Sequence, residues 1–371
     1  TGTRADFGKL KSLIEALTMS GEFDVHIFAT GMHLDERYGY TVHEIEKCGF
    51  KNIYKYANHH SEQLMDVTLA KTIEGFSAFT RQLKPDLIVV HGDRIEALAG
   101  ASVGALNNIL VAHIEGGELS GTVDELIRHA VSKLSQTHFV ANEDAQQRLL
   151  QMGELEESIF IIGSPDMDVM LSETLPSLDE VKRYYEIVFD EYAVSLFHPV
   201  TTEHENMAAY ADEYFSALEQ SALNYVLIYP NNDMGSEFIL NRVKQLSNDR
   251  RFKIFPSMRF EYFLTVLKHA SFIAGNSSCG IREAPYYGVP TINVGSRQNR
   301  RTDNPDIIHA NYNRVSVLQA IGKALNTTIE PSKLFGAGNS NSKFLHILQQ
   351  TSFWKTSKQK IFGDVKFSTS Q

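Results

Sequence analysis

Short apolar runs alternate with amphipathic helical patterns along most of this sequence, and this alternation limits the possible fold more than any other feature. The first half contains DVHIFAT, DLIVVHGD, ILVAHIEGG, THFVAN and IFIIGSPD. Strands that are apolar on both faces are typical of parallel sheets with helices on each side. We therefore predict an α/β fold in which the first half forms one doubly wound domain.

The second half repeats the pattern with YAVSLFHPVT, NYVLIYPNND, FKIFP, SFIAGNSS and PTINVGS. A total of 371 residues suits two domains, each of about 150 to 200 residues. The stretch 166–180 contains Ser and Pro and is the predicted linker between domains 1–170 and 171–340. Within 341–371, the pattern NSKFLHILQQTSFW predicts a helix that returns to the first domain, followed by a frayed polar tail from residue 355.

The chain begins with TGTRADFGKLKSLIEAL, which has the pattern of the loop and first helix of a βα unit. Leu10, Leu13 and Leu17 recur at helical spacing. Such a loop follows a buried strand and offers backbone N–H groups and the helix dipole to a phosphate. We expect a first strand ahead of Thr1 and an anion at this loop.

Composition limits the partners and the compartment. The net charge of −10 argues against nucleic acid or an anionic membrane as the main partner, because both require a basic surface. Only Cys48 and Cys279 are present, which suits a reducing compartment, so a cytoplasmic location is expected. No apolar run approaches the roughly 18 residues of a membrane span.

Three carboxylates follow strands of the first domain: Asp93, Glu115 and Asp124. Asp93 and Asp124 could equally cap helices. A cap explains Glu115 poorly, because Gly116 and Gly117 follow it and allow a ligand close to the backbone. Crowded carboxylates push their pKa values apart, so we expect a raised pKa and a proton-transfer role for Glu115.

Histidines accompany these acids. His91 and His113 precede the first two acids by two residues, and His198 ends the first strand of the second domain in FHPVTTEHE. His198 could bridge a phosphate and a reacting sugar, but each of the three is as consistent with a packed, hydrogen-bonded histidine. No metal-ligand spacing is present, and no metal or cofactor is predicted.

The stretch SFIAGNSSCGIREAPYYGVP predicts an anion site. Ser277 and Ser278 follow a strand and precede a helix that should begin near Gly280, and unpaired N–H groups at a helix start favour negative charge. Glu283, in the first turns, could accept two hydrogen bonds from the diol of a ribose. The alternative is an ordinary Ser cap with a favourable Glu.

Cations surround this predicted anion site. The loop GSRQNRRTD contributes Arg297, Arg300 and Arg301, and Arg4 and Lys9 lie in the opening loop on the other side of the expected cleft. Several cations around one site in an acidic protein point to a diphosphate.

The motifs GTRAD, HGDR, HIEGGE, FHPVTTE and GNSSCGIREAPYYGVP occur in this order, and with them the chain resembles the UDP-N-acetylglucosamine 2-epimerase family. This family has two Rossmann-like domains in the GT-B arrangement, with a cleft between them. In its non-hydrolysing branch a basic His-Arg-Arg-Glu run begins at the position of His198. Here the run is His-Pro-Val-Thr-Thr-Glu, which resembles the hydrolysing branch.

The resemblance implies roles for the residues above. The implied acid/base and junction residues are Asp93, Glu115, Asp124 and His198. Contacts to the substrate are implied for Arg4, Lys9, Arg94, His113, the backbone around Phe263, Ser277, Ser278, Gly280, Glu283 and Arg301.

The implied reaction converts UDP-N-acetylglucosamine and water to UDP and N-acetylmannosamine, through elimination of UDP and hydration of a 2-acetamidoglucal, as the first step of sialic acid synthesis. A homo-oligomer, dimer or tetramer, is also expected. The alternatives are a non-hydrolysing 2-epimerase, a GT-B glycosyltransferase and a nucleotide-sugar sensor.

Overall fold

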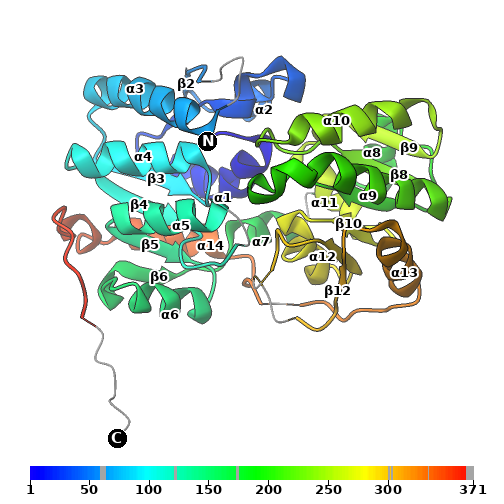
Figure 1. Cartoon of the computed structure of the whole chain (residues 1–371). Helices are drawn as coiled ribbons and strands as arrows, with labels where there is room; N and C mark the ends of the chain where they lie inside the picture. Colours follow the sequence, from blue (N-terminus) through cyan, green and yellow to red (C-terminus); the bar gives the residue numbers. More distant parts are fainter. Residues whose placement is uncertain are drawn as a thin grey trace, which may run out of the picture.

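The computed structural model contains two α/β units that lie side by side, the first blue to cyan-green and the second green to orange in Figure 1. The structure describes residues 1–58, 64–120, 123–172, 175–299, 301, 304–332 and 334–364. Within them, the first unit contains β1 (His26–Ala29), β2 (Asn52–Lys55), β3 (Leu87–His91), β4 (Leu110–Ile114), β5 (Thr137–Val140) and β6 (Ile159–Ile161). β3, β4, β5 and β6 form one parallel sheet in this order, and β1 and β2 form a second.

Helices cover both faces of the four-stranded sheet. The helices of this part of the chain are α1 (Arg4–Ser20), α2 (Val42–Lys47), α3 (Met65–Leu83), α4 (Ile95–Leu106), α5 (Val123–Leu134), α6 (Glu143–Gln151) and α7 (Pro165–Met170), of which α2 packs with β1. Side chains of α1 pack with β4 and β5 on one face, and those of α4 and α5 pack with β3 and β4 on the other. Short 3₁₀ turns occur at η1 (Gly31–Leu34), η2 (Glu36–Tyr38) and η3 (Glu156–Ser158).

A cavity of about 700 Å³ lies between β1 and β3, which do not pair with each other within the described residues. Apolar side chains of both strands line it, among them Phe28 and Val90. Thr1 lies beside the end of β1, where its amino group donates to the Phe28 carbonyl at 2.9 Å. The strand expected ahead of Thr1 stays a prediction.

The second unit is a parallel sheet in the order β12-β11-β10-β7-β8-β9. Its strands are β7 (Ala193–Leu196), β8 (Tyr225–Ile228), β9 (Phe252–Phe255), β10 (Ile273–Gly275), β11 (Thr291–Val294) and β12 (Ile307–Ala310). The helices are α8 (Leu178–Tyr185), α9 (Met207–Ser221), α10 (Ser236–Gln245), α11 (Phe260–Lys268), α12 (Glu283–Tyr286) and α13 (Arg314–Ala324), with 3₁₀ turns η4 (Thr201–Asn206), η5 (Leu246–Asn248) and η6 (Ser278–Gly280). α9, α10 and α13 cover one face, and α8, α11 and α12 cover the other, so this unit is doubly wound.

The predicted linker is partly helical. α7 occupies Pro165–Met170 with proline at its first position, where the missing N–H costs nothing. Its Met167 and Met170 are buried in a core of the second unit. Asp168 accepts the backbone N–H groups of Ser340 and Asn341, each at 2.8 Å, at the start of α14 (Ser340–Gln349).

α14 packs against α1 of the first unit, as the orange-red helix in Figure 1 shows. Its Phe344 and Leu348 share a core cluster with Leu10 and Leu13 of α1. The turn η7 (Phe353–Lys355) follows, and Phe353 joins the same cluster.

The tail after η7 is docked, not frayed as predicted, through residue 364. Lys360 Nζ donates to the carbonyls of Ser132 and Ser135 at 2.7 and 2.5 Å. The Gly363 N–H donates to the Gly153 carbonyl at 2.8 Å. The Ser132 and Ser135 carbonyls lie at the C-terminal end of α5, where the helix dipole favours a cation. Residues 365–371 lie outside the described residues.

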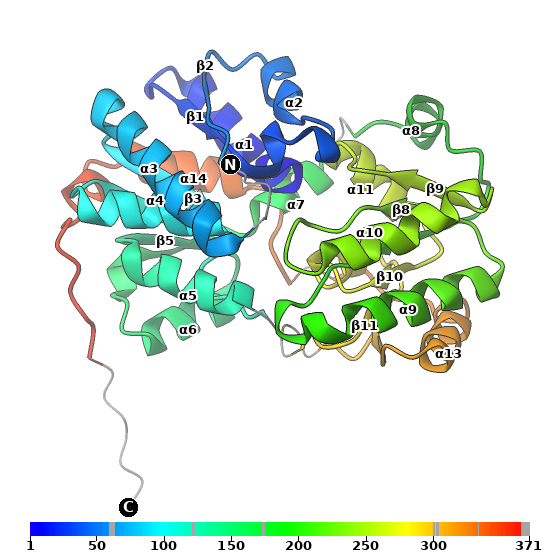
Figure 2. The same ribbon diagram turned by 45° about the horizontal axis from the view of Figure 1, so that its top comes forward.

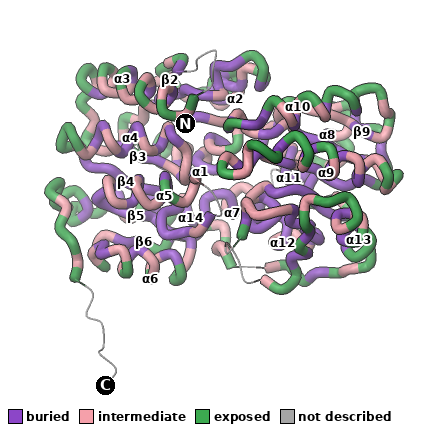
Figure 3. Tube along the Cα trace, viewed as in Figure 1, coloured by how far each residue is buried: buried purple, intermediate pink, exposed green. Residues whose placement is uncertain are grey.

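Buried residues concentrate along the strands and the inward faces of the helices in both units (Figure 3). Among the described helices, none has both the length and the apolar character needed to cross a membrane.

Candidate active site

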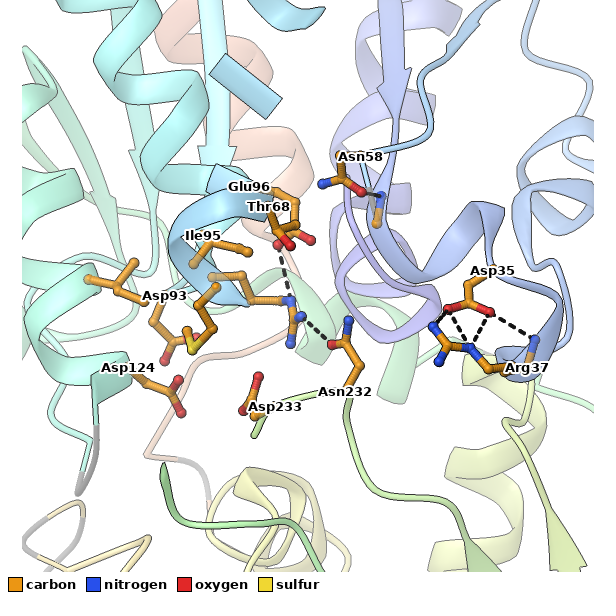
Figure 4. A pocket seen from close by; sticks show the side chains of 14 residues that line it. Asp35, Arg37, Asn58, Thr68, Asp93, Ile95, Glu96, Asp124, Asn232 and Asp233 are labelled. Atoms are coloured by element: carbon orange, nitrogen blue, oxygen red, sulfur yellow. Dashed lines mark hydrogen bonds and ion pairs between the residues drawn. The ribbon is translucent and has the colours of Figure 1, made fainter. Parts of the chain in front are cut away.

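The loops after the strands of the two units meet where the units face each other (Figure 2). Side chains of Asp93, Arg94 and Asp124 from the first unit and of Asn232 and Asp233 from the second line one cavity of about 30 Å³ there (Figure 4). That volume holds about two water molecules. A nucleotide sugar needs a far larger pocket than this cavity.

Glu115 directly follows β4 and has an unusual backbone. Its φ of 65° lies in the left-handed region, which costs a residue other than glycine about 1–3 kcal/mol. The conformation is held because the Glu115 N–H donates to the Phe139 carbonyl at 3.0 Å and its own carbonyl accepts from Arg128 Nη1 at 2.6 Å. Such strain at a buried acid fits a functional residue better than a structural one.

Three cations surround the Glu115 carboxylate. Arg282 Nη2 lies 2.8 Å from Oε1, Lys9 Nζ 3.9 Å from Oε1, and His91 Nε2 3.3 Å from Oε2. Burial raises the pKa of this carboxyl, but the charges of Arg282, Lys9 and His91 outweigh it and hold the pKa well below its usual value. The predicted raised pKa is therefore wrong, and Glu115 is an ionised carboxylate.

His91 links Glu115 to the opening loop. Its Nδ1 lies 2.8 Å from Asp6 Oδ1, while Nε2 faces Glu115. Burial lowers the pKa of His91, but Glu115 and Asp6 raise it to about 9. The sequence left open whether His91 is a packed histidine or a residue of the site. The structure favours a role at the site, because His91 contacts Glu115.

Arg128 joins the two strand-end acids. Its side chain is 1% exposed, contacts Asp93 through Nη2 and donates to the Glu115 carbonyl through Nη1. Burial raises the pKa of Asp93, but Arg128, Arg301 and Arg297 lower it to about 2. The expected closeness of the ends of β3 and β4 is thus observed.

Asp124 lies in the first turn of α5, and its carboxylate contacts the second unit. Its Oδ2 accepts from Arg297 Nη2 at 2.8 Å. The carboxylate of Asp124 therefore joins the two units through Arg297.

His198 has a fixed tautomer. Its Nδ1 accepts the Asn231 N–H at 3.0 Å, so the neutral ring carries its proton on Nε2. Asn276 holds the backbone of His198 at both its N–H, at 2.6 Å, and its carbonyl, at 2.9 Å. Burial, Arg297 and Arg94 keep the pKa of His198 well below its usual value. His198 is therefore a neutral hydrogen-bond donor.

His113 is a packed histidine, contrary to the substrate contact implied for it. It is 0% exposed, its Nε2 bonds to the Gly92 carbonyl at 2.8 Å, and its Nδ1 bonds to Ser132 Oγ at 3.0 Å. Both ring nitrogens are occupied by the protein, so no position remains for a ligand. Burial lowers the pKa of His113 to about 3.

The predicted nucleotide-binding turn differs in detail from the expected helix. Ser278 and Gly280 lie in the turn η6, and α12 begins only at Glu283. A Cβ on Gly280 would come within 2.8 Å of Thr291 Cγ2, so glycine is needed there for packing. Ser277 precedes the turn and, like Ser278, is partly exposed.

Three buried polar atoms in the predicted substrate-binding residues have no hydrogen-bond partner within the described part of the chain. They are Arg4 Nε, Arg301 Nε and Glu283 Oε2. Buried polar groups are nearly always satisfied, so each of these atoms is a candidate for contact with a ligand. Two donors of cationic side chains and one carboxylate acceptor suit a diphosphate and a ribose hydroxyl.

The remaining cations are held by acids. Lys9 Nζ lies 3.3 Å from both Asp166 and Glu283, and Arg301 Nη2 lies 3.6 Å from Glu118. Burial opposes the charge of Lys9, but Glu115 and Glu283 raise its pKa. Arg94 donates to Asn232 Oδ1 at 3.1 Å and pairs with Glu96 at 3.3 Å. Arg300 lies outside the described residues.

Phe263 lies inside α11, with its ring 8% exposed in a core cluster. Its N–H donates to the Arg259 carbonyl at 2.8 Å. The N–H of Phe263 is therefore used inside the chain, and contact of the backbone around Phe263 with the uracil stays a prediction.

Four charged residues at the site carried no signal in the sequence patterns. They are Glu118, Arg128, Asp166 and Arg282. Arg282 could have been noticed, because it directly precedes Glu283 in GIREAP. Among the described residues, no group of three or more His, Cys, Asp or Glu side chains could hold a metal ion.

Comparison with known sequences identifies relatives across nearly the whole chain. A family model described as UDP-N-acetylglucosamine 2-epimerase matches residues 15–349. A UDP-N-acetylglucosamine 2-epimerase from Neisseria meningitidis serogroup B is 49% identical over 98% of each chain. A UDP-N,N'-diacetylbacillosamine 2-epimerase (hydrolyzing) from Legionella pneumophila is 34% identical over 94% of each. The polysialic acid biosynthesis protein P7 of Escherichia coli is 32% identical over 86% of this chain and 84% of that protein.

Comparison with solved structures gives the same fold. The UDP-GlcNAc 2-epimerase of Methanocaldococcus jannaschii, solved in complex with UDP-GlcNAc and UDP, superposes with a TM-score of 0.80 at 25% identity, covering 94% of this chain and 97% of that one. The predicted fold class, two Rossmann-like parallel-sheet units in a GT-B arrangement, is confirmed.

Proposed function

The chain belongs to the UDP-N-acetylglucosamine 2-epimerase family, and from this premise we propose that it converts UDP-N-acetylglucosamine and water to UDP and N-acetylmannosamine. The observation that carries the proposal is Glu115: a buried, ionised carboxylate with a strained backbone at a strand end, opposite the predicted UDP site. The hydrolysing outcome is supported by the His-Pro-Val-Thr-Thr-Glu run at His198 and by the name of the Legionella relative.

Departure of UDP comes first in the proposed mechanism. The hydrogen on C2 of the sugar is not next to a carbonyl, so a carboxylate is too weak a base to remove it from the ground-state sugar. As the C1–O bond breaks, positive charge develops at C1 and acidifies this hydrogen, while Lys9, Arg4 and Arg301 stabilise the leaving diphosphate. Nε2–H of His198 donates a hydrogen bond to the phosphate next to the breaking bond.

Glu115 is the proposed base for the C2 proton, because its cationic neighbours keep it ionised. The elimination leaves UDP and a 2-acetamidoglucal. Water then adds at C1, and a proton reaches C2 on the face opposite to the one that was lost. Asp93 and Asp124 are the other carboxylates available for this second half of the reaction.

The product has a proposed destination in sialic acid synthesis. The Escherichia coli relative is named for polysialic acid biosynthesis, and N-acetylmannosamine is the sugar that such a route would need.

Incubation of the purified protein with UDP-N-acetylglucosamine alone, followed by NMR of the sugar, tests the proposal. Free UDP together with N-acetylmannosamine is the expected result. A mixture of two UDP-sugars would indicate a non-hydrolysing epimerase, and no turnover without an acceptor would favour a glycosyltransferase or a sensor. A parallel incubation with UDP-N,N'-diacetylbacillosamine should give slower turnover, since the relative named for that substrate is less similar than the Neisseria protein.

A further inference from the structure

Arg282 is a fully buried arginine whose guanidinium contacts three carboxylates. Nη1 donates to both carboxylate oxygens of Glu118, at 2.8 and 2.7 Å. Nη2 lies 2.8 Å from Glu115 Oε1 and 3.4 Å from Asp166 Oδ2. The guanidinium also lies over the ring of Phe335, 4.8 Å from its centroid.

Arg282 belongs to the segment of the second unit that is proposed to hold UDP. Its N–H donates to the Ser278 carbonyl at 3.0 Å, and Glu283 follows it directly. Its carboxylate partners belong to the first unit: Glu115 and Glu118 follow β4, and Asp166 lies in α7. One short segment therefore presents Ser278 and Glu283 to the nucleotide and a guanidinium to the acid that faces the sugar.

The arrangement depends on arginine in particular. A buried guanidinium is costly unless its donors are paired, and its planar fork can serve two carboxylates in fixed directions. A lysine at this position would keep the charge but could not hold Glu115 and Glu118 in the same geometry.

We infer that Arg282 is a positioning residue that fixes the Glu115 carboxylate toward the sugar where the two units meet, so that the UDP-binding segment and the acid/base group engage the substrate together. This inference rests on the proposed function, in which Glu115 takes the C2 proton. Arg282 itself need not touch the substrate.

The charges around Glu115 determine how it should respond to loss of Arg282. Lys9 from α1 and His91 from β3 are the other cations at its carboxylate, Arg128 from α5 contacts its carbonyl, and Asp166 from α7 opposes them. Removing Arg282 leaves Lys9 and His91 in place, so Glu115 stays partly stabilised as an anion. Its titration midpoint should still rise by about one to three pH units, the usual effect of one close opposite charge.

The test compares Arg282→Gln and Arg282→Lys with Arg251→Gln, which removes an arginine that pairs with Asp249 far from the site. Protein labelled with ¹³C at the glutamate carboxyls is titrated by NMR, and the Glu115 resonance is assigned by its loss in Glu115→Gln. The Kd for UDP and the pH profile of kcat are measured on the same proteins.

The expected result is a raised Glu115 midpoint in Arg282→Gln, a smaller rise in Arg282→Lys and no change in Arg251→Gln. The acid limb of kcat should move to higher pH in parallel, with kcat falling more than KM rises and the Kd for UDP within a few-fold of the parent. If Arg282→Gln does not fold, Arg282→Gln/Glu118→Gln removes one anion together with the cation and should give the same rise.

A folded Arg282→Gln variant that keeps the kcat of the parent would overturn the inference, because a pair that only joins the two units would still shift the Glu115 midpoint but would not be needed for turnover. Failure of the parent protein to convert UDP-N-acetylglucosamine would instead reject the proposed function, and the NMR titration would still report on Arg282.

Discussion

Asp124 of the first unit accepts a hydrogen bond from Arg297 of the second at 2.8 Å. The other terminal nitrogen of Arg297 donates to the carbonyl of Asn276, at 3.3 Å, and Asn276 holds the backbone of His198. An acid of one unit is thus connected to the strand-end histidine of the other. This connection exists only when the two units are together.

Glu115→Gln should remove turnover while leaving the fold intact. The amide keeps the volume and the left-handed backbone but cannot take a proton, and loss of a general base typically costs about 10²- to 10⁴-fold in kcat. Turnover is measured as the release of UDP, and the affinity for UDP is measured by calorimetry. The affinity should stay within a few-fold of the parent protein. The exposed Glu143 offers a control, Glu143→Gln, that should match the parent. Retained turnover in Glu115→Gln would make Glu115 a structural carboxylate and transfer the role to Asp93 or Asp124.

Glu283→Ala and Ser278→Ala should raise KM more than they lower kcat. Both side chains are proposed to hold UDP equally in the ground and transition states, and Glu283 Oε2 is buried without a partner in the described structure. Steady-state kinetics on UDP-N-acetylglucosamine separate the two constants, with the exposed Ser247→Ala as the control. An unchanged KM in both variants would remove this turn from the nucleotide site.

His91 should make stability depend on pH above neutrality. Its pKa rises from an unfolded value near 6.5 to about 9 in the fold, so the stabilisation is fully present below pH 6.5 and is lost as the pH rises through 9. The loss should amount to about 3 kcal/mol. Urea unfolding at pH 6 and pH 9.5 measures it, and the fall should be much smaller in His91→Gln. A parallel pH dependence in the parent, in His91→Gln and in the exposed control His43→Gln would contradict this role.

His198→Asn should lower kcat without introducing or removing a pH dependence between pH 5 and 7. The residue is already neutral there, because burial, Arg297 and Arg94 depress its pKa. Loss of one hydrogen bond to a charged group corresponds to roughly 10- to 100-fold in rate. A pH profile of kcat on both proteins tests this, and a new or displaced acid limb in the variant would show that His198 titrates during turnover.

The strands were predictable where both faces are buried, because apolar runs such as the one in β4 have a single interpretation. β2 was missed since its residues Asn52–Lys55 are half-exposed and polar at both ends. β12 was missed since Ile307–Ala310 includes the exposed His309 and breaks the apolar run. Docking of the tail through Lys360 depends on the Ser132 and Ser135 carbonyls at the end of α5, more than 200 residues earlier in the chain, so no local pattern reveals it.

The positions of the site acids were also predictable, because the ends of neighbouring parallel strands meet at one edge of a sheet. Their charge states were not. The pKa of Glu115 depends on Arg282 and Lys9, which come from elements far away in the sequence. The packed state of His113 likewise depends on Ser132 in the next helix. Distant partners of this kind decide ionisation, and they become visible only in the folded chain.

The most direct test of the proposed elimination is to run the reaction of UDP-N-acetylglucosamine in D₂O and to examine the sugar by ¹H NMR and mass spectrometry. Removal and return of the C2 proton predicts N-acetylmannosamine with one deuterium at C2, released together with an equal amount of UDP. N-acetylmannosamine that retains the original hydrogen at C2 would contradict the elimination mechanism and, with it, the role proposed for Glu115.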